Sequence, residues 1–186
     1  WVKRLRFRHA GQVVVAAFAA AVAVGTALLM LPIATTAPGS APVVTAVFHA
    51  TSAVCVTGLS TVDTPNYWTP FGQVVILVLI QIGGFGVMTL ASLLGLVLAR
   101  KVGLRTRVTT AQETKSQAIG DLRSLLLGVL RVTVVIESVT AIALVLRWWL
   151  GYGESFGRAA YLGVFHAVSA FNNAGFALFS DNLMGF

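Results

Sequence analysis

Two glycines, Gly58 and Gly175, close two copies of one short motif, and the loops that contain them are the candidates for chemistry. The copies begin at Val47 and Val164 and read VFHATSAVCVTGL and VFHAVSAFNNAGF, with identical residues at seven of thirteen positions. Neither loop contains a carboxylate, a cluster of metal ligands, or a nucleophile with a base. The available chemistry is therefore that of the backbone, whose carbonyl oxygens can replace the hydration shell of a cation.

A glycine at the same place in both copies indicates a backbone conformation that residues with a side chain reach poorly. An ordinary glycine at the C-terminal cap of a helix is the alternative explanation. Because the same glycine follows the same Phe-His-Ala-x-Ser-Ala segment twice, we favour a filter in which carbonyls point inward toward an ion.

The composition places the elements that hold these loops in a membrane. Hydrophobic residues make up 57% of the chain and charged residues 10%, with a mean hydropathy of +0.87, whereas a soluble domain is about one-quarter charged. The net charge of +7 comes from residues beside apolar runs, without a recognition motif, so nucleic acid is not the expected partner. Irregular backbone at membrane depth must be buried or line a water-filled cavity, which favours pore loops.

Three long apolar runs are predicted to span the membrane as helices, since about twenty residues cross the hydrocarbon core. They cover residues 12–31, 71–99 and 125–146. Thr69 and Pro70 are expected to be the N-cap and the first residue of the second of these helices. Trp148 and Trp149 are expected to mark the membrane interface after the third.

Two helices that are too short to span are predicted directly before the glycine loops. Pro42 suits the first turn of one, which ends near Ala53, and the other runs from about Ser155 to Ala170. The order is then spanning helix, short helix, loop and spanning helix, followed by the start of the same order. The expected fold class is an all-α membrane protein of repeated helix–pore loop–helix units, incomplete in this chain.

Polar and small residues inside the predicted helices are further candidates. For the glycines of the second span, Gly83, Gly84 and Gly86, close helix packing is favoured over a gating hinge. Glu137 lies midway along the third span and is expected to face the protein interior, because an unpaired charge there is costly. His49 and His166, at equivalent places in the two copies, are expected to have a structural role rather than to sense pH.

The basic residues predict how these segments are oriented. Of the thirteen Lys and Arg residues, four lie before residue 9 and six between residues 100 and 123, whereas residues 33–69 contain none. Under the positive-inside rule both basic segments are cytoplasmic. The N-terminus is then cytoplasmic, residues 100–123 form a solvated connector, and both short helices enter from the outer face.

The motifs resemble the KtrB and TrkH family of potassium transporter subunits, in which four linked repeats of helix, pore loop and helix surround one pore. The most specific matches are FHATSAVCVTGLST, from Phe48 to Thr61, and FHAVSAFNNAGF, from Phe165 to Phe176. QIGGFG, residues 81–86, is similar to the second helix of the family, and the short basic N-terminus is closer to KtrB. The resemblance implies a potassium site lined by backbone groups of Val56, Thr57, Gly58, Asn173, Ala174 and Gly175.

The resemblance also implies partners and a location. It implies a multi-pass protein of the bacterial plasma membrane, assembled in the lipid bilayer as a homodimer of full-length subunits on a cytoplasmic ring of nucleotide-binding KtrA or TrkA subunits. Potassium is then the transported ion and sodium a modulator. Any nucleotide belongs to the partner, because this chain contains no phosphate-binding fingerprint.

The expected function is potassium uptake through a selective, gated pore, without enzyme chemistry. Residues 1–123 are interpreted as the first repeat with its cytoplasmic connector. Residues 124–186 are interpreted as a second repeat that stops after its filter loop, so that the chain is the N-terminal portion of a pore subunit. The alternatives are a subunit of a tetrameric cation channel and a membrane scaffold that conducts no ion.

Overall fold

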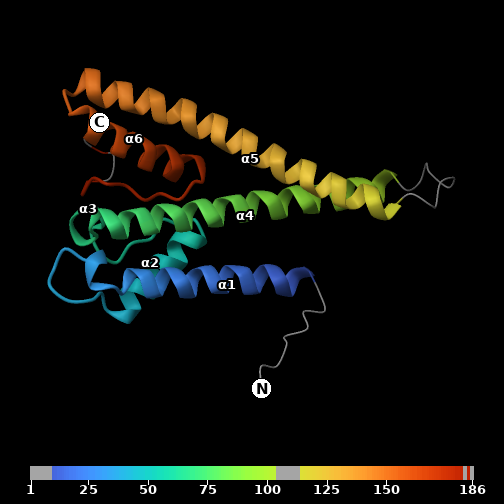
Figure 1. Cartoon of the computed structure of the whole chain (residues 1–186), viewed down its shortest axis with the longest axis horizontal. Coiled ribbons are helices and arrows are strands. Elements are labelled where there is room, and N and C mark those ends of the chain that lie inside the picture. The colour runs from blue at the N-terminus through green and yellow to red at the C-terminus, as the bar shows by residue number, and fades with distance from the viewer. Residues whose placement is uncertain (1–9, 104–113, 182–183, 185–186) are drawn as a thin grey trace. The chain divides into compact units, whose positions relative to one another are not determined.

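The part of the chain that the structure describes is built from helices. The structure, a computed structural model, describes residues 10–103, 114–181 and 184. Along the chain (Figure 1) the helices are α1 (Ala10–Leu29), α2 (Val43–Val54), α3 (Thr64–Tyr67), α4 (Pro70–Gly103), α5 (Thr114–Leu146) and α6 (Phe156–Phe171). A 3-10 turn (Pro32–Ala34) follows α1 and a π-helical turn (Arg147–Gly151) follows α5. The predicted all-α fold, with short helices α2 and α6 before the glycine loops, is confirmed.

The chain divides into two compact units. The first consists of Trp1–Gly83 together with Val168–Phe186, and the second consists of Gly84–Ala167. Residues 54–59, named here the first loop, and residues 171–176, the second loop, therefore belong to the same unit.

Helices α4 and α5 contain segments that are long and apolar enough to cross a bilayer. These are Pro70–Ser92 and Ser124–Gly151, with mean hydropathies of 2.4 and 2.2. Only 6% of the second segment is buried, and side chains such as Val139 and Ile142 are about 60% exposed. An apolar surface of this extent needs lipid or other membrane helices around it. For α1, whose apolar segment covers Val14–Leu29, the predicted crossing stays a prediction.

Caps at the helix starts follow from the local sequence. The Thr69 hydroxyl accepts a hydrogen bond from the Gly72 amide (3.4 Å) and donates one to the Ile33 carbonyl (2.6 Å). Thr69 and Pro70 are thus the N-cap and first residue of α4, as predicted. Ser155 caps α6 in the same way, because its hydroxyl accepts from the Arg158 amide (3.4 Å).

In the first unit, small residues and one buried tryptophan allow close packing. A Cβ added at Gly25 of α1 would lie 2.5 Å from the Leu79 side chain of α4, so these helices touch directly. The segment after α1 pairs with the segment before α4, since the Thr69 amide donates to the Ala34 carbonyl (3.0 Å). Trp68, completely buried, fills the space beside this pairing.

In the second unit, α6 packs tightly on α5. A Cβ added at Gly163 would lie 2.5 Å from the Val145 side chain. Trp148 is only 4% exposed and its ring lies 5.2 Å from that of His166 in a T-shaped arrangement. Trp148 is therefore a packing residue of this unit, whereas Trp149 is 44% exposed. The predicted location of the two tryptophans at a membrane interface stays a prediction.

The polar stretch between residues 100 and 123 is helical at both ends. Helix α4 continues to Gly103 and α5 begins at Thr114. The segment between the two helices is therefore shorter than the connector that was expected over residues 100–123. Residues 1–9 and 104–113 lie outside the described residues. The orientation inferred from their charges stays a prediction.

Candidate functional site

The two short helices end with the same hydrogen-bond pattern. At the end of α2 the Val56 amide donates to Ala53 (3.1 Å) and the Thr57 amide to Ser52 (3.0 Å). At the end of α6 the corresponding residues, Asn173 and Ala174, donate to Ala170 (3.0 Å) and Ser169 (2.8 Å). This is the Schellman motif, in which a residue with left-handed backbone closes the helix.

The left-handed residues of these caps are Val56 (φ 51°) and Asn173 (φ 55°). Asparagine tolerates this conformation, but for a β-branched valine it is a genuine outlier. Gly58 (φ 68°) and Gly175 (φ 74°) lie two residues further on. The explanation that these glycines are ordinary helix caps is therefore wrong, because other residues already occupy the cap positions.

The caps leave carbonyl oxygens facing away from the helices. All peptide bonds are trans in the described residues, and the C=O and N–H bonds of a trans peptide point in opposite directions. Because the amides of Thr57 and Ala174 point back at the helix ends, the carbonyls of Val56 and Asn173 point outward. In the described part of the chain, no hydrogen bond reaches the carbonyls of the six predicted ligands, Val56, Thr57, Gly58, Asn173, Ala174 and Gly175.

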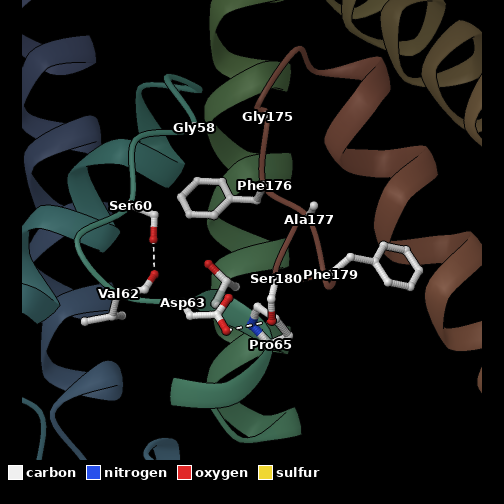
Figure 2. Close-up of a pocket in the computed structure, with 11 residues that line it drawn as sticks. Gly58, Ser60, Val62, Asp63, Pro65, Gly175, Phe176, Ala177, Phe179 and Ser180 are labelled. Atoms are coloured by element: carbon white, nitrogen blue, oxygen red, sulfur yellow. Dashed lines mark hydrogen bonds between the residues drawn. The ribbon is translucent and has the colours of Figure 1, made fainter. Parts of the chain in front are cut away.

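The two glycines meet backbone to backbone (Figure 2). A Cβ added at Gly58 would lie 2.3 Å from the Ala174 carbonyl oxygen and 2.9 Å from the Gly175 Cα, and one added at Gly175 would lie 3.4 Å from the Gly58 Cα. Positive φ and this close approach both require glycine. The structure thus brings together the two loops that the sequence predicted to share one site.

The serine that both motifs contain holds each loop differently. Ser52 Oγ lies 3.0 Å from Thr57 Oγ1, whereas Ser169 Oγ donates to the Phe176 carbonyl (2.7 Å). Both serines are buried. The same serine occurs in both copies of the motif, and this repetition could have indicated that it supports the loop. The sequence analysis assigned it no such role.

The two motif histidines are structural, as expected. His49 Nδ1 donates to the Thr45 carbonyl (2.9 Å) and His166 Nδ1 to the Leu162 carbonyl (2.8 Å). Each ring also makes a T-shaped contact with a buried tryptophan, Trp68 or Trp148. Burial lowers the pKa of both histidines below its ordinary value, opposed by the backbone hydrogen bond. The contacts and the lowered pKa fit the expected structural role better than a role in sensing pH.

A half-open cavity of about 430 Å³ adjoins the two glycines. In Figure 2 Phe176 projects between the loops, and Asp63 and Ser180 meet at the far end of the cavity. Ser180 Oγ donates to Asp63 Oδ2 (2.8 Å), and Asn66 Nδ2 donates to both of them (3.0 and 2.6 Å). This network, which sequence reasoning did not find, ties the segment after the first loop to the segment after the second.

Helix α4 contacts both loops. A Cβ added at Gly83 would lie 2.1 Å from the Val54 carbonyl oxygen, so the predicted packing role of this glycine has a partner at the first loop. Two residues earlier, Gln81 Oε1 accepts a hydrogen bond from Asn172 Nδ2 (3.1 Å) in the second loop. Helix α4 is continuous through Gly84 and Gly86, and a hinge there stays a prediction.

Side-chain metal ligands are not gathered anywhere in the described ranges, where no three His, Cys, Asp or Glu residues come together. Glu137 is half-buried on α5, in the second unit, and its predicted interior role is untested. The site that the described residues offer is therefore a pair of backbone loops whose oxygens are available to a cation.

Helices of membrane-spanning length and two matching helix–loop units define an all-α membrane protein. The TrkH family, described as cation transport protein, matches residues 1–186. The chain belongs to this family.

Relatives of this chain include three proteins described as uptake proteins. Ktr system potassium uptake protein B of Bacillus subtilis (strain 168) is 44% identical over 185 residues, covering 100% of this chain and 40% of the relative. Potassium/sodium uptake protein NtpJ of Enterococcus hirae is 34% identical over 183 residues, covering 98% and 40%. Ktr system potassium uptake protein B of Vibrio alginolyticus is 38% identical over 141 residues, covering 76% and 30%. The chain therefore spans 30% to 40% of the length of these relatives.

Proposed function

We propose that this chain forms part of a potassium-translocating pore and that the first and second loops supply two sides of its filter. One observation carries the proposal: two loops of matching backbone meet at their glycines, and their carbonyls accept no hydrogen bond within the described residues. The descriptions of the relatives as potassium uptake proteins support potassium as the ion.

In this proposal a partly dehydrated K⁺ moves down its electrochemical gradient, and no covalent bond is made. Backbone oxygens of the six predicted ligand residues replace its water. The C-terminal ends of α2 and α6, which carry the negative end of the helix dipole, add a favourable potential beside the loops. K⁺ is the cargo.

The wider organisation follows from the sequence and is proposed with it. Residues 1–123 and 124–186 are successive repeats, the second running through its filter loop. The N-terminus lies in the cytoplasm, and the short helices enter the plasma membrane from outside, consistent with the basic residues near the N-terminus and between residues 100 and 123.

Partners belong to the same proposal. The words "Ktr system" in two relatives' descriptions support a transporter with more than one component, here a homodimer on a nucleotide-binding ring of the KtrA or TrkA type. The description of the Enterococcus relative as a potassium/sodium uptake protein supports an influence of sodium. Gly83, Gly84 and Gly86 are proposed to serve close helix packing, with a gating hinge as the alternative, and Glu137 is proposed to face the protein interior.

Growth rescue tests this function. The full-length gene product, expressed in cells deficient in potassium uptake, is expected to restore growth at low potassium, and Gly58→Ser is expected to abolish the rescue at an equal amount of protein in the membrane. Leu59→Val, at an exposed neighbouring position, is the matched control and should still rescue. An abundant wild-type protein that neither rescues growth nor takes up rubidium would favour the non-conducting scaffold.

A further inference from the structure

The second loop has a side-chain support that the first loop lacks. Asn172 is 6% exposed, and its Nδ2 donates to Gln81 Oε1 (3.1 Å) and to the Val168 carbonyl (2.9 Å). The matching residue of the first loop is Cys55, which is exposed and makes no side-chain hydrogen bond within the described residues. The hydrogen bond that Asn172 donates to Gln81 therefore has no counterpart at Cys55.

The position of Asn172 couples this bond to the predicted ion ligands. Asn172 is the C-cap of α6, and the next residue, Asn173, has the left-handed backbone that directs its carbonyl outward. A buried side chain that is fixed at both of its amide hydrogens leaves the adjoining peptide little freedom to rotate. Gln81 thus acts on the second loop through Asn172.

The same helix contacts the first loop from a different face. Gln81 and Gly83 are two residues apart on α4, which places them about 200° apart around the helix axis. Gly83 lies against the Val54 carbonyl, whereas Gln81 reaches Asn172. Helix α4 therefore sets the position of the second loop relative to the first.

We propose that Gln81 is a positioning residue for ion selectivity, holding the second loop at the spacing that suits K⁺ rather than the smaller Na⁺. This proposal rests on the proposed transport function. Selectivity among alkali cations depends on the number and arrangement of the surrounding oxygens, so a second loop released from α4 can close around the smaller ion. The first loop, held by close packing, stays in place.

The test uses the full-length gene product in vesicles, with K⁺ and Na⁺ uptake measured on the same preparation. Gln81→Leu removes the acceptor and is expected to lower the K⁺/Na⁺ uptake ratio about tenfold, as the loss of one buried hydrogen bond can do. Gln81→Glu keeps an acceptor oxygen and should retain most of the ratio. The matched control is Gln73→Leu, because Gln73 also lies on α4 and its Nε2 donates to the carbonyls of Trp68 (2.8 Å) and Pro65 (3.3 Å), which lie outside both loops.

The control separates selectivity from folding. Gln73→Leu is expected to reduce the amount of protein in the membrane without changing the ratio. If Gln81→Leu does not reach the membrane, the pair Asn172→Asp and Asn172→Leu replaces it, because Gln81 can turn its amide to donate to an aspartate but not to a leucine. The K⁺/Na⁺ uptake ratio is then expected to fall in Asn172→Leu but not in Asn172→Asp.

Three results would overturn the proposal. One is an unchanged ratio in Gln81→Leu or Asn172→Leu, and another is an equal fall in the Gln73→Leu control. The third is a fall in the K⁺/Na⁺ uptake ratio that is as large in Gln81→Glu as in Gln81→Leu, because the acceptor oxygen at residue 81 would then not matter. A wild-type protein that moves neither ion contradicts the transport function itself, a failure that is seen before any variant is compared.

Discussion

The first and second loops have the same backbone conformation, but different side chains support it. Both follow a Schellman cap, both have positive φ two residues before the glycine and at the glycine, and both keep the same serine. The first loop places exposed residues, Cys55 and Thr57, where the second places buried ones, Asn172 and Ala174. What has been retained between the copies is thus the path of the main chain.

This difference indicates which features the proposed ion site requires. A site made of backbone oxygens needs the carbonyls in place but not any particular side chain. The supports can therefore differ, by packing against Gly83 in the first loop and by hydrogen bonding to Gln81 in the second. Substitutions that alter the two loops unequally test this comparison.

The largest difference in ion uptake is expected between the variants Gly58→Ala and Gly175→Ala. Both substitutions force a side chain into left-handed backbone, at a cost of about 1–2 kcal/mol. Only at Gly58 would the new Cβ also overlap a carbonyl oxygen, 2.3 Å away. In rubidium uptake per amount of membrane protein, Gly58→Ala should fall to background and Gly175→Ala about tenfold. Equal losses would contradict the contact geometry.

The next difference concerns the motif serines. Ser169→Ala leaves the Phe176 carbonyl without its hydrogen bond and should lower the free energy of unfolding by about 1–3 kcal/mol. Ser52→Ala loses a bond to the exposed Thr57 hydroxyl, which water can replace, and should cost less than about 1 kcal/mol. Thermal unfolding in detergent compares the two variants. If Ser52→Ala lowered the free energy of unfolding more than Ser169→Ala does, the Ser52 hydrogen bond would be the more important of the two.

An exchange of the cap residues is expected to give a smaller effect of opposite sign in the two loops. Val56→Asn relieves strained backbone and should stabilise the protein by about 1 kcal/mol, whereas Asn173→Val should destabilise it by about the same amount. Val56→Gly is the control for backbone strain without a polar side chain. Melting temperatures of the purified variants measure these changes, and a destabilised Val56→Asn would show that valine is needed there for packing.

The smallest effect is expected at the rim of the cavity, where Asp63 links the two loops through Ser180. Exposed charged groups contribute under about 1 kcal/mol, so Asp63→Asn should leave stability nearly unchanged. Loss of its charge should reduce initial uptake about twofold at low ionic strength and have no effect at high salt. Ser180→Ala, which removes the contact but keeps the charge, is the control. A salt-independent effect of Asp63→Asn would point to the hydrogen bonds instead.

Much of this arrangement was predictable because it depends on local signals. The repeated motif, Thr69-Pro70 and the apolar runs correctly predicted both short helices and the start of α4. Contacts between distant residues left no such signal. Gln81 and Asn172 are 91 positions apart, and nothing in either sequence segment indicates that their side chains meet.

Two features of the structure could not be derived from residue types alone. A tryptophan beside an apolar run is equally suited to an exposed and to a buried position, and the packing of His166 against Trp148 could not be foreseen from the local sequence. A glycine helix cap was the alternative explanation for Gly58 and Gly175, because glycine is the usual left-handed residue at a cap. Val56 occupies that position despite its branched side chain, and residue preference alone could not have identified it.

The Schellman caps have one further consequence. Three successive amides of each loop, those of residues 55–57 and 172–174, are already bonded to the preceding helix. At these residues the backbone that faces away from the helix therefore offers carbonyl oxygens and no free amide N–H groups, which suits a cation better than an anion. In the proposed pore, a preference for cations over anions would then come from the direction of the peptide bonds rather than from a charged side chain.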